Sequence, residues 1–171
     1  MKTILIAFLC GTTFLSAQNK TAKIIVNKDN SIYWQSENLT QEGAIKAMHY
    51  ANTLAEASNK KIAIAVLDAS GRPILMTIAD GVGPHNLEAA RRKAFTALST
   101  KTPTLLLARN AAANPDTQNL NSLPELLLLG GGVPLIVNHK VIGSIGIAGA
   151  GGPEQDNTIA EQTSKALIQI N

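Results

Sequence analysis

The stretch IAIAVLDASGRPILMTI, residues 62–78, contains two apolar runs separated by a turn. Residues 62–67 are apolar throughout, which is typical of a buried strand, and residues 73–78 predict a second strand. Between the runs, Asp-Ala-Ser-Gly at 68–71 has the composition of a tight turn. We therefore expect an antiparallel hairpin in the middle of the chain.

Helices are predicted on both sides of this hairpin. Thr40 is a candidate N-cap for a helix that carries alanines at helical spacing and ends near Asn59. After the hairpin, the periodicity predicts a helix over residues 86–99. A short helix should follow from Pro103 through about residue 110, and residues 111–123 are then expected to form a loop.

Three further apolar runs lie in the second half of the chain, at residues 126–129, 133–137 and 141–147. Asn138-His139-Lys140 predicts a hairpin turn between the last two, and Pro153 suits the first position of a final helix. The order is helix, two strands, two helices, three strands, helix. This order predicts an α+β fold in which an antiparallel five-stranded sheet is flanked by helices.

The first 17 residues have the order of a secretory signal peptide. A basic start, Met1-Lys2, precedes an apolar stretch and the small residues Ser16-Ala17. We expect cleavage near Ala17 and export to the periplasm or the exterior, with an uncleaved N-terminal anchor as the alternative. Residues 18–38 are then an N-terminal arm, and residues 39–171 are one domain.

Composition excludes several classes of protein. The only cysteine, Cys10, lies in the predicted signal peptide, so removing 17 of the 171 residues leaves 154 residues without a thiol. This excludes a disulfide framework and a cysteine zinc site. The net charge of +3 comes without basic blocks, which argues against a nucleic-acid binder. With few aromatic residues and no disulfide, the chain should gain stability by forming a homo-oligomer.

Glycines are concentrated between residues 130 and 152. One interpretation is a phosphate cradle, but the Lys-Ser/Thr pair of a P-loop is missing. Glu154 and Asp156 also place negative charge where a phosphate would bind. We favour the other interpretation, in which these glycines form a tight turn and let a strand and a helix pack closely.

The start of the second helix carries the clearest candidate ligand set. His85 follows Gly83-Pro84 and could ligate haem iron; the alternative is an exposed residue near the helix cap. Behind it are cations that could pair with haem propionates, and apolar residues could support the ring. The proposed cations are Arg91, Arg92 and Lys93, and the proposed ring contacts are Met76, Ile78 and Phe95. Catalytic residues are not indicated, since Ser70 lacks the G-x-S-x-G context.

Four segments together resemble the GlcG/HbpS family over about residues 39–170. They are IAVLDASGRP (64–73) followed by ADG (79–81), AARRKAFTA (89–97), GGVPL (131–135), and VIGSIGIAGA (141–150) with PEQD (153–156). The resemblance implies a profilin-like fold and homo-oligomers of four to eight subunits.

The same resemblance implies a function related to tetrapyrroles. Family members include secreted haem-binding proteins that partner a two-component sensor, and haem-binding domains of some cobalamin adenosyltransferases. Haem is therefore the expected ligand, with a corrinoid as the second choice. The leading hypothesis is an exported haem-binding protein that sequesters or senses haem or iron. The alternatives are a protein that binds or acts on a small organic acid of the glycolate type, and a partner-binding module for a membrane sensor kinase.

Overall fold

The computed structural model describes residues 36–168. The predicted signal peptide and residues 18–35 of the predicted arm lie outside the described residues. The helices are α1 (Gln41–Ala57), α2 (His85–Thr100), α3 (Thr104–Ala113), α4 (Pro115–Gln118), the 3-10 helix η1 (Asn119–Ser122) and α5 (Pro153–Ile168). The strands are β1 (Ala63–Asp68), β2 (Pro73–Ile78), β3 (Gly132–Val137) and β4 (Lys140–Ala148).

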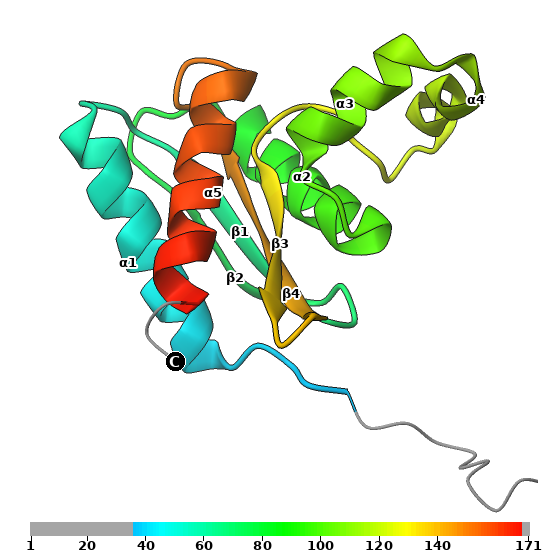
Figure 1. Ribbon diagram of the computed structural model, residues 1–171. Helices are drawn as coiled ribbons and strands as arrows, with labels where there is room; N and C mark the ends of the chain where they lie inside the picture. The colour runs from blue at the N-terminus through cyan, green and yellow to red at the C-terminus, as the bar shows by residue number, and fades with distance from the viewer. Residues whose placement is uncertain (1–35, 169–171) are drawn as a thin grey trace, which may run out of the picture. The chain divides into compact units, whose positions relative to one another are not determined.

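The strands form one antiparallel sheet in the order β2-β1-β4-β3. The predicted hairpin of β1 and β2 is confirmed, with Ala65 opposite Met76. Helices α1 and α5 cover one face of the sheet, and α2 covers the other (Figure 1). The sheet therefore separates two different packing layers.

Alternation along β1 explains why the two layers differ. Successive side chains of a strand point to opposite faces. Ile64 and Val66 join the larger core beneath α1 and α5, whereas Ala63 and Ala65 face α2. The small alanine side chains let α2 lie close to the sheet.

Glycines in β3 and β4 bring α2 still closer. A Cβ added to Gly146 would lie 2.0 Å from the carbonyl oxygen of Ala90, and one added to Gly132 would lie 2.1 Å from that of Lys93. Both distances are far too short for a carbon next to backbone. The interpretation of these glycines as close-packing positions is confirmed.

The predicted α+β class and the antiparallel sheet are confirmed, but the predicted number of five strands is wrong for residues 36–168, which form four. The missing strand is the apolar run 126–129. Its backbone is bonded to side chains instead of a neighbouring strand: Leu126 O accepts from Arg92, and Leu127 N donates to Thr96. Leu129 O accepts from Thr104.

The helix boundaries follow the sequence with one clear exception. The side chain of Thr40 caps α1 as predicted, and the turn at Asn138-His139 has the positive φ angles of a tight hairpin. The loop predicted over 111–123 is wrong in part, because it contains the end of α3 together with α4 and η1. Asn114 explains why a new helix begins there, since its side chain accepts a hydrogen bond from Asp116 N and caps α4.

Among the described helices, none is both long and apolar enough to cross a membrane.

Candidate functional site

Five of the seven predicted binding residues lie on α2, and the other two, Met76 and Ile78, lie on β2. His85 is the first residue of α2, and its side chain is exposed. Its ring lies over Gly83, where an added Cβ would be 3.1 Å from the imidazole Cε1. The imidazole is therefore available to a ligand that approaches the start of α2.

An apolar surface runs along the flank where α2 meets β2. Met76 packs with Val82 and Leu87 against the alanines beneath α2. Further along, the ring of Phe95 lies against Gly71 in the β1–β2 turn, at 3.4 Å from a Cβ built there. Met76 and Phe95 are half-buried, so each offers apolar surface to a ligand. We call this surface the α2–β2 flank.

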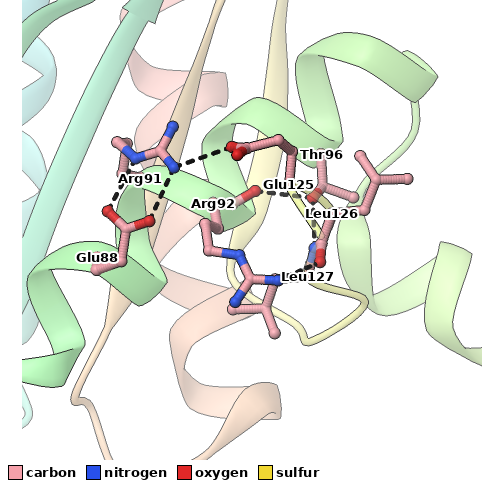
Figure 2. A network of polar contacts seen from close by, with 7 residues as sticks. All are labelled: Glu88, Arg91, Arg92, Thr96, Glu125, Leu126 and Leu127. Atoms are coloured by element: carbon pink, nitrogen blue, oxygen red, sulfur yellow. Dashed lines mark hydrogen bonds and ion pairs between the residues drawn. The ribbon is translucent and has the colours of Figure 1, made fainter. Parts of the chain in front are cut away.

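Arg91 is already held by two carboxylates. Its guanidinium donates two hydrogen bonds of 2.8 Å to Glu88, one turn earlier on α2, and one of 3.2 Å to Glu125 (Figure 2). The hydrogen bonds to Glu88 raise the pKa of Arg91, and the same contact lowers the pKa of Glu88. Both carboxylates are exposed, so an external anion could compete with them.

Arg92 turns away from Arg91 and toward the segment before β3. Its Nη2 donates a 2.6 Å hydrogen bond to Leu126 O, and Thr96 Oγ1 accepts a 2.8 Å hydrogen bond from Leu127 N (Figure 2). Arg92 Nε is buried and lacks a hydrogen-bond partner among residues 36–168. Arg92 and Thr96 together hold Leu126 and Leu127 against α2.

Lys93 lies inside the protein. Its side chain is 1% exposed, and its Nζ donates to Asp156 Oδ2 at 2.7 Å and to Ile147 O at 3.0 Å. Asp156 Oδ1 in turn accepts a 2.8 Å hydrogen bond from Ala150 N. Burial lowers the pKa of Lys93, although Asp156 opposes this by stabilising the charged form. The ammonium ties α2 to β4 and α5, and it does not reach the α2–β2 flank.

The three consecutive cations of α2 therefore have three different surroundings. Arg91 lies in an exposed ion-pair network, Arg92 holds a neighbouring segment, and Lys93 is part of the core. Of the predicted set, His85, Met76, Ile78 and Phe95 are accessible without displacing an internal partner. Residues 36–168 contain no group of three or more His, Cys, Asp or Glu side chains able to hold a metal ion.

Two clefts lie on other parts of the surface, and only one of them is lined by a predicted binding residue. One of about 330 Å³ lies between the start of α1 and the end of α5, with Leu39, Ile142 and Leu167 in its wall. Another, of about 440 Å³, is lined by Lys60, Lys61 and Ile78. The second one touches the predicted ring contact Ile78, at the end of β2.

Three structurally important residues were not singled out as partners from the sequence. The sequence indicates Asp156 only as a carboxylate at the start of a helix, and it gives Thr96 and Glu125 no separate role. Their partners are 31 to 63 positions away along the chain. For Lys93 the sequence does contain one indication of burial. Lys93 lies one helical turn from both Ala90 and Ala97, so it shares their buried face of α2.

Comparison with known proteins identifies the family. The model of the family described as haem degrading protein HbpS-like matches residues 39–165. An uncharacterised 15.0 kDa protein encoded between dhaT and dhaS in Citrobacter freundii is 30% identical over 138 residues, which cover 80% of this chain and 96% of that protein.

Solved structures agree with this assignment. A double mutant of HbpS from Streptomyces reticuli is 34% identical, with a TM-score of 0.74 over 83% of this chain and 95% of that one. A complex of PduOC with haem is 27% identical, with a TM-score of 0.67 over 77% of this chain and 95% of that one. The chain belongs to the HbpS-like family, as the four sequence segments indicated.

Proposed function

We propose that this chain binds haem on the α2–β2 flank, with His85 as an axial ligand. The observation that carries the proposal is the likeness to HbpS and to PduOC, whose structure was solved with haem. The accessible imidazole at the start of α2 supports it from this chain's own residues.

The residues present fit a haem in their chemistry. An imidazole nitrogen is a usual ligand of haem iron, and Met76 and Phe95 offer apolar contacts to the ring. Arg91 is the cation best placed to meet a propionate, because its present partners are exposed glutamates. Lys93 is left out, because its ammonium is satisfied in the core. When bound, haem would supply an iron centre that an imidazole nitrogen can ligate.

The direct test is a haem titration of the full-length protein, followed in the Soret region. We expect a shifted Soret band with wild type, and a changed spectrum with at least tenfold weaker binding for His85→Ala. His49→Ala is the matched control, because His49 is also an exposed helical histidine, on α1, and should leave both unchanged.

Two outcomes would overturn the proposal at different levels. If wild type gives no Soret shift, haem binding is refuted, and stabilisation by glycolate-type acids in a thermal-shift assay would then favour the organic-acid alternative. If His85→Ala behaves like His49→Ala, the haem has a different axial ligand.

We further propose that the chain is exported and acts as a homo-oligomer that sequesters haem or iron, or reports it to a membrane sensor kinase. The signal-like residues 1–17 support export. Mass spectrometry of the protein from fractionated host cells should give an N-terminus at Gln18 outside the cytoplasm. An intact Met1 in the cytoplasmic fraction would refute export.

A further inference from the structure

Residues 125–127 follow η1 and lead toward β3, and each of them makes a hydrogen bond to α2. Glu125 accepts one of 3.2 Å from Arg91. The next two residues use their backbone groups, which are bonded to Arg92 at 2.6 Å and to Thr96 at 2.8 Å (Figure 2). We call residues 125–127 the docked stretch, because these consecutive bonds hold it on α2.

The contact between Arg91 and Glu125 lies at the exposed end of the docked stretch. The two side chains are 27% and 62% exposed. Residues 121–125 are all exposed, and Leu126 is the first buried residue after them. Segments with few buried contacts open locally at low cost in free energy. Losing the Glu125 contact should therefore let the docked stretch open from this end more often.

Arg91 also belongs to the α2–β2 flank. Residues four positions apart on a helix are neighbours on its surface. Arg91 lies four positions after Leu87 and four before Phe95, and both of these side chains form part of the flank. The stem of Arg91 is thus on the flank, while its guanidinium reaches Glu125. One side chain joins the surface proposed to bind haem to the docked stretch.

Of the two carboxylates on Arg91, Glu125 is the one that a competing carboxylate should displace. Glu88 accepts two hydrogen bonds of 2.8 Å from the guanidinium, whereas Glu125 accepts a single one of 3.2 Å. A bidentate pair between arginine and a carboxylate is stronger than a single hydrogen bond. Glu88 also lies on the same helix as Arg91, one turn earlier, so it stays close to the guanidinium.

We propose that Glu125 is an internal competitor for Arg91, and that a carboxylate-bearing ligand on the α2–β2 flank displaces it and loosens the docked stretch. This coupling rests on the proposed function, in which the haem propionates are the competing carboxylates. It gives the occupancy of the flank a second readout, in a different segment of the chain. Because coupling between two binding equilibria is reciprocal, removing the Glu125 carboxylate should also strengthen the binding of haem.

The first experiment needs no ligand. Hydrogen exchange of the full-length protein is followed by mass spectrometry in peptides that cover the docked stretch. Glu125→Ala should speed exchange there by about two- to fivefold, the range expected for an exposed ion pair. Glu88→Ala is the matched control, because it removes the other carboxylate of Arg91 and leaves the Glu125 contact in place. It should exchange no faster than wild type in these peptides, and β3 and β4 should stay protected in both variants.

The second experiment compares haem with haem dimethyl ester, which lacks the propionate charges. At saturation, haem should speed exchange of the docked stretch in wild type by about two- to fivefold, and the ester should not. In Glu125→Ala haem should cause no further increase, and this variant should bind haem at least about twofold more tightly than wild type.

The outcomes separate this coupling from the proposed function. If wild type gives no Soret shift with haem, both are refuted. If haem binds but the docked stretch exchanges no faster with haem than with the ester, only the coupling is refuted. The same conclusion follows if Glu125→Ala exchanges like Glu88→Ala.

Discussion

Breaking the buried pair of Lys93 and Asp156 should be among the most damaging changes available in this protein. The two side chains are 1% and 6% exposed, and their charged atoms are 2.7 Å apart. Removing one partner leaves the other charge buried and unpaired, which costs about 3–5 kcal/mol in comparable cases. We expect Lys93→Met alone and Asp156→Leu alone each to lower the free energy of unfolding by about that amount. A domain of this kind has about 5–15 kcal/mol in total, so either variant is close to unfolding.

The double variant separates a pair from two independent residues. Lys93→Met/Asp156→Leu leaves no buried charge. Its remaining defects are the N–H of Ala150 and the carbonyl of Ile147, which each lose a side-chain partner, and an unpaired buried group costs about 1–3 kcal/mol. The double variant should therefore be more stable than either single variant. Urea unfolding at neutral pH, followed by circular dichroism, gives the three values. If the single losses add to within about 0.5 kcal/mol, the two residues do not interact and the reasoning is wrong.

Three further predictions concern other contacts. Gly146→Ala forces a methyl group into the backbone of α2 and should lower the free energy of unfolding by at least about 1–3 kcal/mol in the same urea assay. Gly43→Ala in α1 is the control, because the added methyl group meets mainly the flexible end of a side chain, and this variant should be as stable as wild type or more stable. Thr96→Val leaves the N–H of Leu127 without its acceptor, so hydrogen exchange at residues 125–127 should become faster while the rest of β3 and β4 stays protected. Burial raises the pKa of Asp68, but hydrogen bonds from the β1–β2 turn outweigh burial and leave the pKa below its ordinary value. The ionised carboxylate therefore stabilises the fold above the ordinary carboxyl pKa, and this stabilisation is lost as the pH falls through the pKa of the folded state. Asp68→Asn should accordingly be less stable than wild type at pH 7, and the difference in unfolding free energy should shrink in acid.

The parts of the fold that were predictable are those with a local cause. The β1–β2 hairpin follows from two apolar runs and a turn that lie next to each other in sequence. The apolar run 126–129 shows the limit of that reasoning. Its composition is that of a strand, but its backbone groups find side-chain partners on α2 and α3. Composition alone does not say which partner a backbone group will meet.

The candidate site shows the same limit more sharply. Three consecutive basic residues on a helix suggest one charged surface, yet Arg91, Arg92 and Lys93 point to different partners. Helical geometry turns each residue by about 100° from the last, so neighbours in sequence do not share a face. The partner of Lys93 is 63 positions away, at the first turn of α5. Only the fold brings these two charges together.

The contacts of α2 also limit where the affinity for a ligand can originate. A carboxylate that binds Arg91 must replace Glu88 or Glu125, and exposed ion pairs of this kind are worth about 0–1 kcal/mol. Replacing a glutamate of Arg91 by a propionate changes the free energy little, so the propionates should add little to the affinity for haem. If haem binds as proposed, its binding energy would come from His85 as a ligand of the iron and from apolar contact with Met76 and Phe95. Haem dimethyl ester, which lacks the propionate charges, should accordingly bind within about tenfold of haem, a difference of about 1.4 kcal/mol. A much larger loss would mean that Arg91 leaves its glutamates and closes on the ligand.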